Sequence, residues 1–398
     1  MRKICVVITA RTSYTKIRPV LKAIQEHPEL ELQVICAGSA LLNRYGDIDH
    51  IIEKDGFPVS ERIYMVVEGE TLMTSAKTTG LGMIEFASAY KKLDPDVVFI
   101  MADRYEQMAA AIPAAYMNIP IAHAQGGEVT GNIDEKVRHA ITKLADIHFP
   151  ATQRAAEWLV RMGENTEKVI FSGCPSTDLC QSVLDKPELD FDLYQKYGGV
   201  GGNPDFSGQF LIVMQHPVTT EYGSAKEQAE ETLQAIVEID LPTFWFWPNL
   251  DAGSDQTSKA IRTFRENNKQ NQLHFFRNME PLDFLRLLNK ASVIIGNSSC
   301  AIREASFLGT AAVNIGTRQA NREQGPNAMN SGYNYKEIAN AIRTQLAKGK
   351  LPSTHLYGDG KAAKKIADSL ASFDLSSYKI LNYLDDFQQT DQKRMIHS

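Results

Sequence analysis

The feature that most constrains the fold is an alternation of short β-branched runs with longer amphipathic stretches, which occurs twice along the chain. This alternation predicts parallel strands joined by helices, because a parallel strand can be reached only through a crossover connection. The strands expected in the first half are residues 4–8, 34–36, 97–101, 119–123 and 169–172. Those expected in the second half are residues 210–214, 243–247, 273–276, 293–295 and 312–315. The helices expected between them include residues 71–92, 135–145, 224–239, 281–289 and 299–308.

We therefore expect an α/β protein with two doubly wound domains, because 398 residues with 43% hydrophobic content are enough for two cores. The glycine- and proline-rich residues 197–208 interrupt the alternation and mark the expected boundary. The N-terminal domain is then residues 1–195, and the C-terminal domain is residues 209–375. Residues 376–398 are expected to form a helix that packs back on a domain, followed by a tail. Ligands of such domains bind beyond the carboxyl ends of the strands, so a cleft between the two is the expected site.

Composition excludes several classes of function. The formal net charge of -6 comes from 48 acidic and 42 basic residues with no basic block, which argues against a nucleic-acid partner. No apolar run is long enough to span a membrane, and the short apolar stretch after Met1 is typical of a strand rather than a signal peptide. The five cysteines are odd in number and lack Cys-x-x-Cys spacing, which argues against disulfides and a zinc site. We expect a cytoplasmic protein without a metal or another cofactor.

The strongest local signal is the sequence GNSSCAIREA at residues 296–305, which follows an expected buried strand. Ser298 and Ser299 place hydroxyls at an expected helix start, where a diphosphate is favoured, although an ordinary N-cap explains them equally well. Glu304 can accept hydrogen bonds from ribose hydroxyls. Arg318 follows the next strand and can reach the same phosphates. Taken singly, each of these two charges is more commonly just solvated.

Two further polar residues follow strands of the second half. His216 comes directly after residues 210–214 and can bind a phosphate oxygen, although a lone histidine is more often structural. Asn249 has the corresponding place after residues 243–247, whose aromatic side chains are expected in the core.

In the first half, Asp103 and Arg104 follow residues 97–101 and suit an acid or base and a phosphate ligand, respectively. The sequence HAQGGEVTG at residues 123–131 follows the next strand, and its glycines allow close approach of a ligand. Asp134 and Glu135 open the following helix, where charge complementarity with the helix dipole is the simpler explanation. Carboxylates that follow successive strands nevertheless favour catalysis.

The loop and helix after the first strand carry two cations. Arg11 and Lys16 lie in the sequence TARTSYTK at residues 9–16, and we expect them to neutralise the diphosphate from the opposite wall of the cleft.

With these motifs in this order, the chain resembles the UDP-N-acetylglucosamine 2-epimerase family, especially the hydrolysing branch that makes N-acetylmannosamine for sialic acid synthesis. The resemblance spans most of the chain and is carried by residues 103–104, 126–131, 133–134, 138–143, 215–217, 248–249, 296–299, 303–304 and 316–318. It implies a GT-B-like pair of Rossmann-type domains with a cleft between them. The nucleotide is then held mainly by the C-terminal domain, and the sugar faces the N-terminal domain. Family precedent also implies a homodimer or homotetramer.

The resemblance assigns the catalytic carboxylates to Asp103 and Asp134. It assigns the nucleotide contacts to Arg11, Arg104, His216, Asn249, Ser298, Ser299, Glu304 and Arg318. Two positions depart from the family pattern, since Gln125 and Ser13 stand where an acid is common.

The chemistry of the sugar sets what such a site must do. The hydrogen on carbon 2 has no adjacent carbonyl to acidify it, so a carboxylate can remove it only while the bond from carbon 1 to oxygen breaks. Loss of UDP gives a 2-acetamidoglucal, and addition of water with a proton on the other face gives the epimerised sugar. Two acid/base groups are needed, which suits Asp103 and Asp134 with Glu128 or Glu135 in support, and His216 beside the leaving group.

We therefore expect a hydrolysing UDP-N-acetylglucosamine 2-epimerase whose partner is a small UDP-sugar. The nearest rival function is the same reaction on a UDP-2,4-diacetamido-2,4,6-trideoxyhexose of the legionaminic acid pathway, because the amide of Gln125 can donate a hydrogen bond to a second acetamido carbonyl. A non-hydrolysing epimerase, a GT-B glycosyltransferase and a nucleotide-sugar sensor without turnover are also compatible with these residues.

Overall fold

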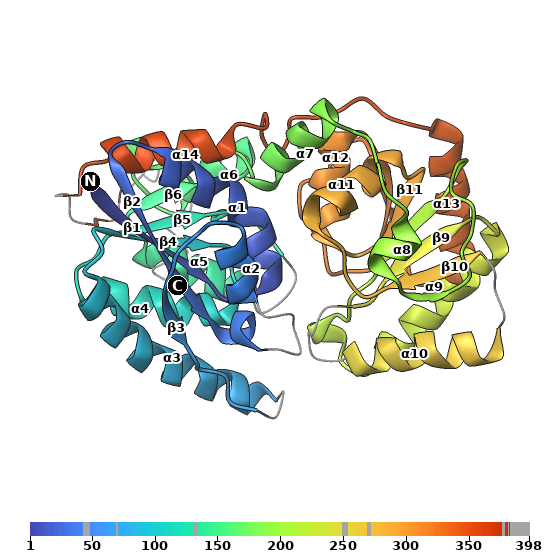
Figure 1. The fold of residues 1–398 in the computed structure, drawn as a ribbon, viewed down its shortest axis with the longest axis horizontal. Coiled ribbons are helices and arrows are strands. Elements are labelled where there is room, and N and C mark those ends of the chain that lie inside the picture. The colour runs from blue at the N-terminus through green and yellow to red at the C-terminus, as the bar shows by residue number, and fades with distance from the viewer. Residues whose placement is uncertain are drawn as a thin grey trace, which may run out of the picture.

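The computed structural model describes residues 1–42, 48–68, 71–130, 134–248, 254–268, 272–375, 379–380 and 382. It shows two α/β domains side by side (Figure 1). Within the described ranges, the first domain has a six-stranded sheet of order β3-β2-β1-β4-β5-β6. The second has a seven-stranded sheet of order β13-β12-β11-β8-β9-β10-β7. Among the described residues, no helix combines the length and the apolar composition that crossing a membrane requires.

The first sheet is parallel throughout. Its strands are β1 (Arg2–Ile8), β2 (Leu30–Ala37), β3 (Val59–Ile63), β4 (Val97–Met101), β5 (Ile121–Ala124) and β6 (Ile147–Phe149). Its helices are α1 (Arg11–Glu26), α2 (Ile48–Lys54), α3 (Leu72–Leu93), α4 (Tyr105–Tyr116), α5 (Asp134–Leu144) and α6 (Gln153–Arg161). Alternate residues of β1 enter two cores, with Ile4 and Val6 on one face and Cys5 and Val7 on the other, as a sheet covered on both sides requires.

The second sheet repeats the parallel arrangement and adds one antiparallel edge strand. Its strands are β7 (Val200–Gly201), β8 (Leu211–Met214), β9 (Thr243–Phe246), β10 (Leu273–Phe276), β11 (Val293–Gly296), β12 (Ala311–Ile315) and β13 (Ala328–Ser331). Its helices are α7 (Ser176–Asp185), α8 (Leu193–Tyr197), α9 (Ala225–Ile239), α10 (Ser254–Asn267), α11 (Pro281–Lys290), α12 (Glu304–Leu308) and α13 (Tyr335–Lys348).

The parallel strands of the two sheets share one connectivity, because the first parallel strand of each sheet is central and the later ones extend to both sides. β1 lies between β2 and β4, and β8 lies between β9 and β11. In such doubly wound sheets, the chain leaves two adjacent central strands toward opposite sides, and the loops after these two strands open a crevice between them. The loops after β1 and β4, and those after β8 and β11, are therefore the places where ligands are expected.

Two segments outside the candidate site differ from their expected structures. Residues 197–208 are not a linker, because β7 pairs with β10 at the edge of the second sheet. The ring of His274 holds this segment through the carbonyl oxygens of Gly198 and Gly202, at 2.9 and 2.6 Å. Residues 169–172 do not form the expected strand, because pairing there is limited to one bridge between His148 and Val169.

The chain passes between the domains at two adjacent points. Cys174 N donates to Tyr357 O at 2.7 Å, and a Cβ on Gly173 would lie 2.7 Å from the Cα of Gly358. Both glycines have a positive φ, 86° and 118°, so a side chain at either would strain the backbone as well as clash. The two crossing segments therefore form one compact connection.

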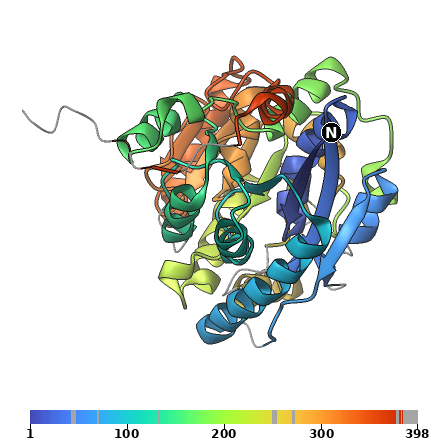
Figure 2. The same cartoon turned by 90° about the vertical axis from the view of Figure 1, so that its left-hand side faces the viewer.

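These crossing points change the extent of the domains. α7 contributes Cys180 and Val183 to the core of the second domain, although the sequence predicts residues 1–195 for the first. The helix that returns to the first domain is α14 (Ala362–Ser372), which lies within the range 209–375 and packs Ile366 and Leu370 against α1 and its neighbours. It covers the first domain in Figure 1, and Figure 2 views that domain from its own side. The expected helix in residues 376–398 falls mostly outside the described residues.

Candidate active site

The loops at the centre of the second sheet are tied together by Asn297. Its Oδ1 accepts a hydrogen bond from His216 N at 2.8 Å, and its Nδ2 donates to His216 O at 2.8 Å. Both residues are buried, and they follow β11 and β8, respectively. Asn297 thus fixes the backbone of His216 at the crevice that the strand order predicts.

Ser298 and Ser299 begin a tight turn rather than the expected helix of residues 299–308. A 3₁₀ turn spans Ser299–Ala301, and α12 begins only at Glu304. Ser298 Oγ accepts a hydrogen bond from Cys300 N at 3.4 Å, which caps the turn. This cap favours a 3₁₀ turn, whose hydrogen bonds join residues three apart, over an α-helix. Glu304 is consequently the first residue of α12 and is buried. An anion bound here would depend on hydroxyls and nearby cations, because the dipole of a long helix is not available.

Two cations approach these serines from opposite domains. Lys16, on α1, places its Nζ 3.3 Å from Ser299 Oγ. Arg318, in the loop after β12, donates from Nη1 to Asn297 O at 3.2 Å. Burial, followed by the charge of Arg303, lowers the pKa of Lys16, as expected for a cation placed among cations away from water. An anionic ligand at this point would offset both effects.

Arg11 is the first residue of α1, and burial lowers the pKa of its guanidinium. Arg104 lies at the N-cap of α4, and its Nε and Nη2 donate to the Glu106 carboxylate at 3.1 and 3.0 Å. Contact of Arg104 with a phosphate stays a prediction. Asn249 lies outside the described residues.

The acid Asp103 is positioned by a strained turn after β4. Ala102 has a φ of 70°, which is uncommon for a residue with a side chain. His123 Nε2 lies 3.0 Å from Ala102 O and donates to it, because a carbonyl can only accept. Burial lowers the pKa of His123 to about 3, so this ring is neutral at ordinary pH. The histidine holds the turn from which Asp103 projects.

Arg138 of α5 gathers the carboxylates of the first domain. Its guanidinium is 1% exposed and pairs with the Asp103 carboxylate and, at 3.1 Å, with Glu135. It also donates to Glu128 O at 2.8 Å. Asp134 is the first residue of the same helix. The structure thus brings Asp103 and the start of α5 together, as their positions after successive strands predict.

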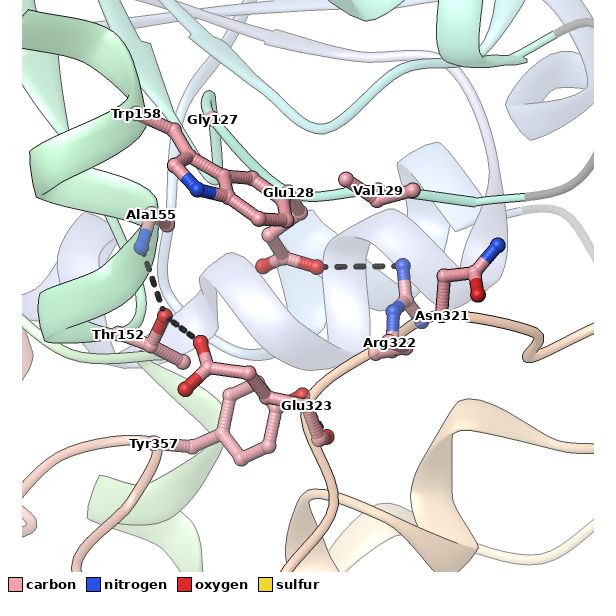
Figure 3. A pocket seen from close by; sticks show the side chains of 10 residues that line it. All are labelled: Gly127, Glu128, Val129, Thr152, Ala155, Trp158, Asn321, Arg322, Glu323 and Tyr357. Atoms are coloured by element: carbon pink, nitrogen blue, oxygen red, sulfur yellow. Dashed lines mark hydrogen bonds and ion pairs between the residues drawn. The ribbon is translucent and has the colours of Figure 1, made fainter. Parts of the chain in front are cut away.

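Glu128 reaches across to the second domain, which the sequence did not indicate. Its carboxylate lies 2.5 Å from Arg303 Nη2 and 3.1 Å from Arg322 Nη2, and the side chains of all three are at most 8% exposed. A second link joins Thr152 of the first domain to Glu323 (Figure 3). Charges in loops after strands were visible in the sequence, but their pairing depends on how the domains meet.

Gln125 does not project freely into the cleft. It is buried, has a φ of 66°, and donates from Nε2 to Cys174 Sγ at 3.3 Å. Cys174 lies at the crossing between the domains and also receives Arg303 Nη1 at 3.4 Å. Any role of Gln125 in choosing the sugar therefore involves this interdomain cluster.

The chain has two doubly wound domains joined by a double crossing. Hydroxyls and cations lie at the crevice of the second domain, and carboxylates lie at that of the first. This combination is typical of a GT-B-like enzyme of nucleotide-sugar chemistry. The model of one protein family, "UDP-N-acetylglucosamine 2-epimerase", matches residues 22–371. The chain therefore belongs to the UDP-N-acetylglucosamine 2-epimerase family.

Curated relatives match over most of their length. A Legionella pneumophila protein named "UDP-N,N'-diacetylbacillosamine 2-epimerase (hydrolyzing)" is 32% identical over 96% of this chain and 98% of its own. A Neisseria meningitidis protein named "UDP-N-acetylglucosamine 2-epimerase" is 29% identical over 90% of this chain and 92% of its own. The crystal structure of UDP-GlcNAc 2-epimerase from Neisseria meningitidis bound to UDP-GlcNAc matches with a TM-score of 0.78 at 18% identity, over 92% of this chain and 99% of that one. This last likeness establishes the shared fold.

Proposed function

We propose that the chain is a hydrolysing UDP-sugar 2-epimerase, which converts UDP-N-acetylglucosamine or a close analogue and water into UDP and the free 2-epimerised sugar. The observation that carries the proposal is a chain of contacts across the domain junction, in which Arg138 links Asp103 to Glu128, and Glu128 pairs with Arg303 and Arg322 of the second domain. Lys16 reaches Ser299 at the diphosphate end, while Arg138 holds Asp103 beside the start of α5 at the sugar end. The hydrolysing relative from Legionella pneumophila supports the same reaction type.

Departure of UDP is the step that the second domain assists. As the bond between carbon 1 and oxygen breaks, its electron pair and negative charge move to the β-phosphate. Lys16, Arg318 and the serine hydroxyls are the proposed donors to this charge, with His216 and Arg11 nearby. Fixed donors in a site that excludes water are worth more than the same groups in solution.

The first domain supplies the proton transfers. We assign the base to Asp103, because an ion pair with a guanidinium stabilises a carboxylate in its charged form. The base takes the hydrogen of carbon 2 as a proton, and the electron pair left behind forms the double bond of the glycal. Water then adds its oxygen to carbon 1, while Asp134 delivers a proton to the other face of carbon 2. The proton that this water loses returns Asp134 to its acid form, and Asp103 releases its own proton to solvent. Glu135 supports this arrangement through Arg138.

The sugar itself is a choice between two candidates. UDP-N-acetylglucosamine would yield N-acetylmannosamine for a sialic acid pathway. A UDP-2,4-diacetamido-2,4,6-trideoxyhexose is the second candidate, favoured by the Legionella pneumophila relative and by a Campylobacter jejuni relative, 28% identical, named for diacetylbacillosamine. A cytoplasmic location remains a prediction from the sequence, and a homodimer or homotetramer remains a prediction from the family.

An NMR time course with each UDP-sugar tests the proposal. Equimolar UDP and free 2-epimerised sugar are expected, and the faster sugar identifies the substrate. Accumulation of a 2-epimerised UDP-sugar would indicate a non-hydrolysing enzyme. UDP release only on addition of an acceptor sugar would indicate a glycosyltransferase. Binding without turnover would indicate a sensor.

A further inference from the structure

The most unusual electrostatic feature outside the proposed reaction centre is the carboxylate of Glu128. It is buried between two guanidinium groups that both belong to the other domain, Arg303 at 2.5 Å and Arg322 at 3.1 Å. Burial lowers the pKa of Arg303, but the Glu128 carboxylate raises it to a net value above the ordinary range. Trp158 and Tyr357 line the pocket that Glu128 and Arg322 also line (Figure 3). The carboxylate is strongly held in place, because moving it away would leave two buried guanidinium groups without a counter-charge in a poorly solvated site.

On the second-domain side, this junction is connected to the diphosphate end of the site. Arg322 Nη1 donates to Gln319 Oε1 at 2.9 Å, and Gln319 Nε2 donates to Asn297 O at 2.9 Å. The same carbonyl receives Arg318. The loop that carries the proposed phosphate ligand Arg318 is therefore the loop that grips Glu128.

On the first-domain side, the junction is connected to the acids. The carbonyl oxygen of Glu128 accepts from Arg138 Nη1 at 2.8 Å, and the other arm of Arg138 pairs with Asp103. The backbone of Glu128 is thus fixed relative to Asp103, while its side chain is fixed relative to Arg322. One residue connects the two halves of the site.

The position of the junction in the fold suits an alignment role. Arg303 lies over the ring of Tyr357 at 5.3 Å and contacts Cys174, so the junction adjoins the two crossing segments. Gly173 and Gly358 meet there without side chains. Backbone of this kind can absorb a rotation between domains, which leaves the relative placement of the two halves to contacts such as those of Glu128.

We propose, on the basis of the proposed function, that Glu128 is a positioning residue whose ion pairs with Arg303 and Arg322 align the carboxylates of the first domain with the diphosphate loop of the second. Its contribution to turnover then comes from placement and not from proton transfer. Removing the Glu128 carboxylate, or the Arg322 guanidinium that ties it to the diphosphate loop, should therefore produce the same kind of defect.

The test compares Glu128→Gln, Arg322→Met and the double variant in the full-length protein. Both single variants should lower kcat by about a hundredfold, the cost of displacing reacting groups by about an ångström. The double variant should fall within about threefold of the worse single variant, because both changes break one junction. The limbs of the pH profile of kcat should stay in place. Arg343→Met, which breaks an exposed ion pair with Glu238, is the matched control and should match the unmodified protein.

A second measurement does not depend on turnover. Hydrogen exchange with and without UDP should show that UDP slows exchange in residues 123–130 of the unmodified protein, and that Arg322→Met abolishes this slowing although it still binds UDP. Loss of one pH limb in Glu128→Gln, with near-normal turnover in Arg322→Met, would make Glu128 an acid or base and overturn the proposal. So would unchanged protection in Arg322→Met. If the unmodified protein turns over no UDP-sugar, the proposed function fails, while the exchange result still decides whether the junction links the domains.

Discussion

Lys16 offers the sharpest test of where the diphosphate binds. Its ammonium group lies 3.3 Å from Ser299 Oγ in a partly buried position, and it comes from the domain opposite Ser299 and Arg318. Two unit charges about 4 Å apart attract by about 4 kcal/mol at an effective dielectric constant of about 20. Desolvation of both groups offsets roughly half of this, which leaves about 2 kcal/mol. Lys16→Met, which keeps most of the side-chain volume, should therefore weaken UDP binding by about 30-fold.

Isothermal titration calorimetry with UDP is the assay, at low and at high salt. Lys22→Met is the matched control, because Lys22 lies on the same helix with its side chain 67% exposed and its nearest acid, Glu26, at 3.8 Å. The control should bind UDP as the unmodified protein does, since exposed pairs contribute little. A change of less than about twofold in Lys16→Met would show that the diphosphate does not lie beside Ser299, because a directly paired charge cannot be worth so little.

Three further outcomes follow from the same structure. Asp103→Asn and Asp134→Asn should each lower kcat at least about a hundredfold while UDP affinity stays within a few-fold, and near-normal turnover would remove that residue from the mechanism. Arg318→Ala should weaken UDP binding by about tenfold in the same calorimetry, and unchanged affinity would place the phosphates elsewhere. The free energy of unfolding should fall as the pH drops below about 6.5. His123 has a pKa of about 3 in the folded protein and about 6.5 in the unfolded chain, so below about pH 6.5 only the unfolded chain binds this proton and is stabilised by it. Denaturant midpoints from pH 7.5 to 5 measure this, with a slope of up to about 1.4 kcal/mol per pH unit, and a flat profile would mean that His123 is charged or exposed.

The parts of the fold that the sequence predicts are those whose local pattern agrees with their burial. β4 and β10 coincide with the expected residues 97–101 and 273–276, because uninterrupted apolar runs have one stable place, inside a parallel sheet. β6 cannot be recognised in the sequence, because three residues between two helices leave no visible period. β7 resembles a linker in the sequence because its glycines give no strand signal. It is a strand only because it pairs with β10, which is distant in the sequence.

The same distinction applies to the site. The placement of Asp103, Asp134, Ser298 and Arg318 could be predicted because each follows a strand, and the carboxyl ends of parallel strands share one edge of a sheet. Their roles stay predictions. The pairing of Glu128 with Arg303 and Arg322 could not be predicted, because it depends on how two separate domains meet.

The most direct test of the central claim is the reaction of the UDP-sugar in deuterated water, followed by NMR and mass spectrometry. Proton removal from carbon 2 followed by hydration predicts equimolar UDP and a free 2-epimerised sugar that carries one deuterium at carbon 2. Free sugar of unchanged configuration without deuterium would mean simple hydrolysis, and deuterium in a recovered UDP-sugar without free sugar would mean reversible epimerisation. Either result would contradict the proposed function.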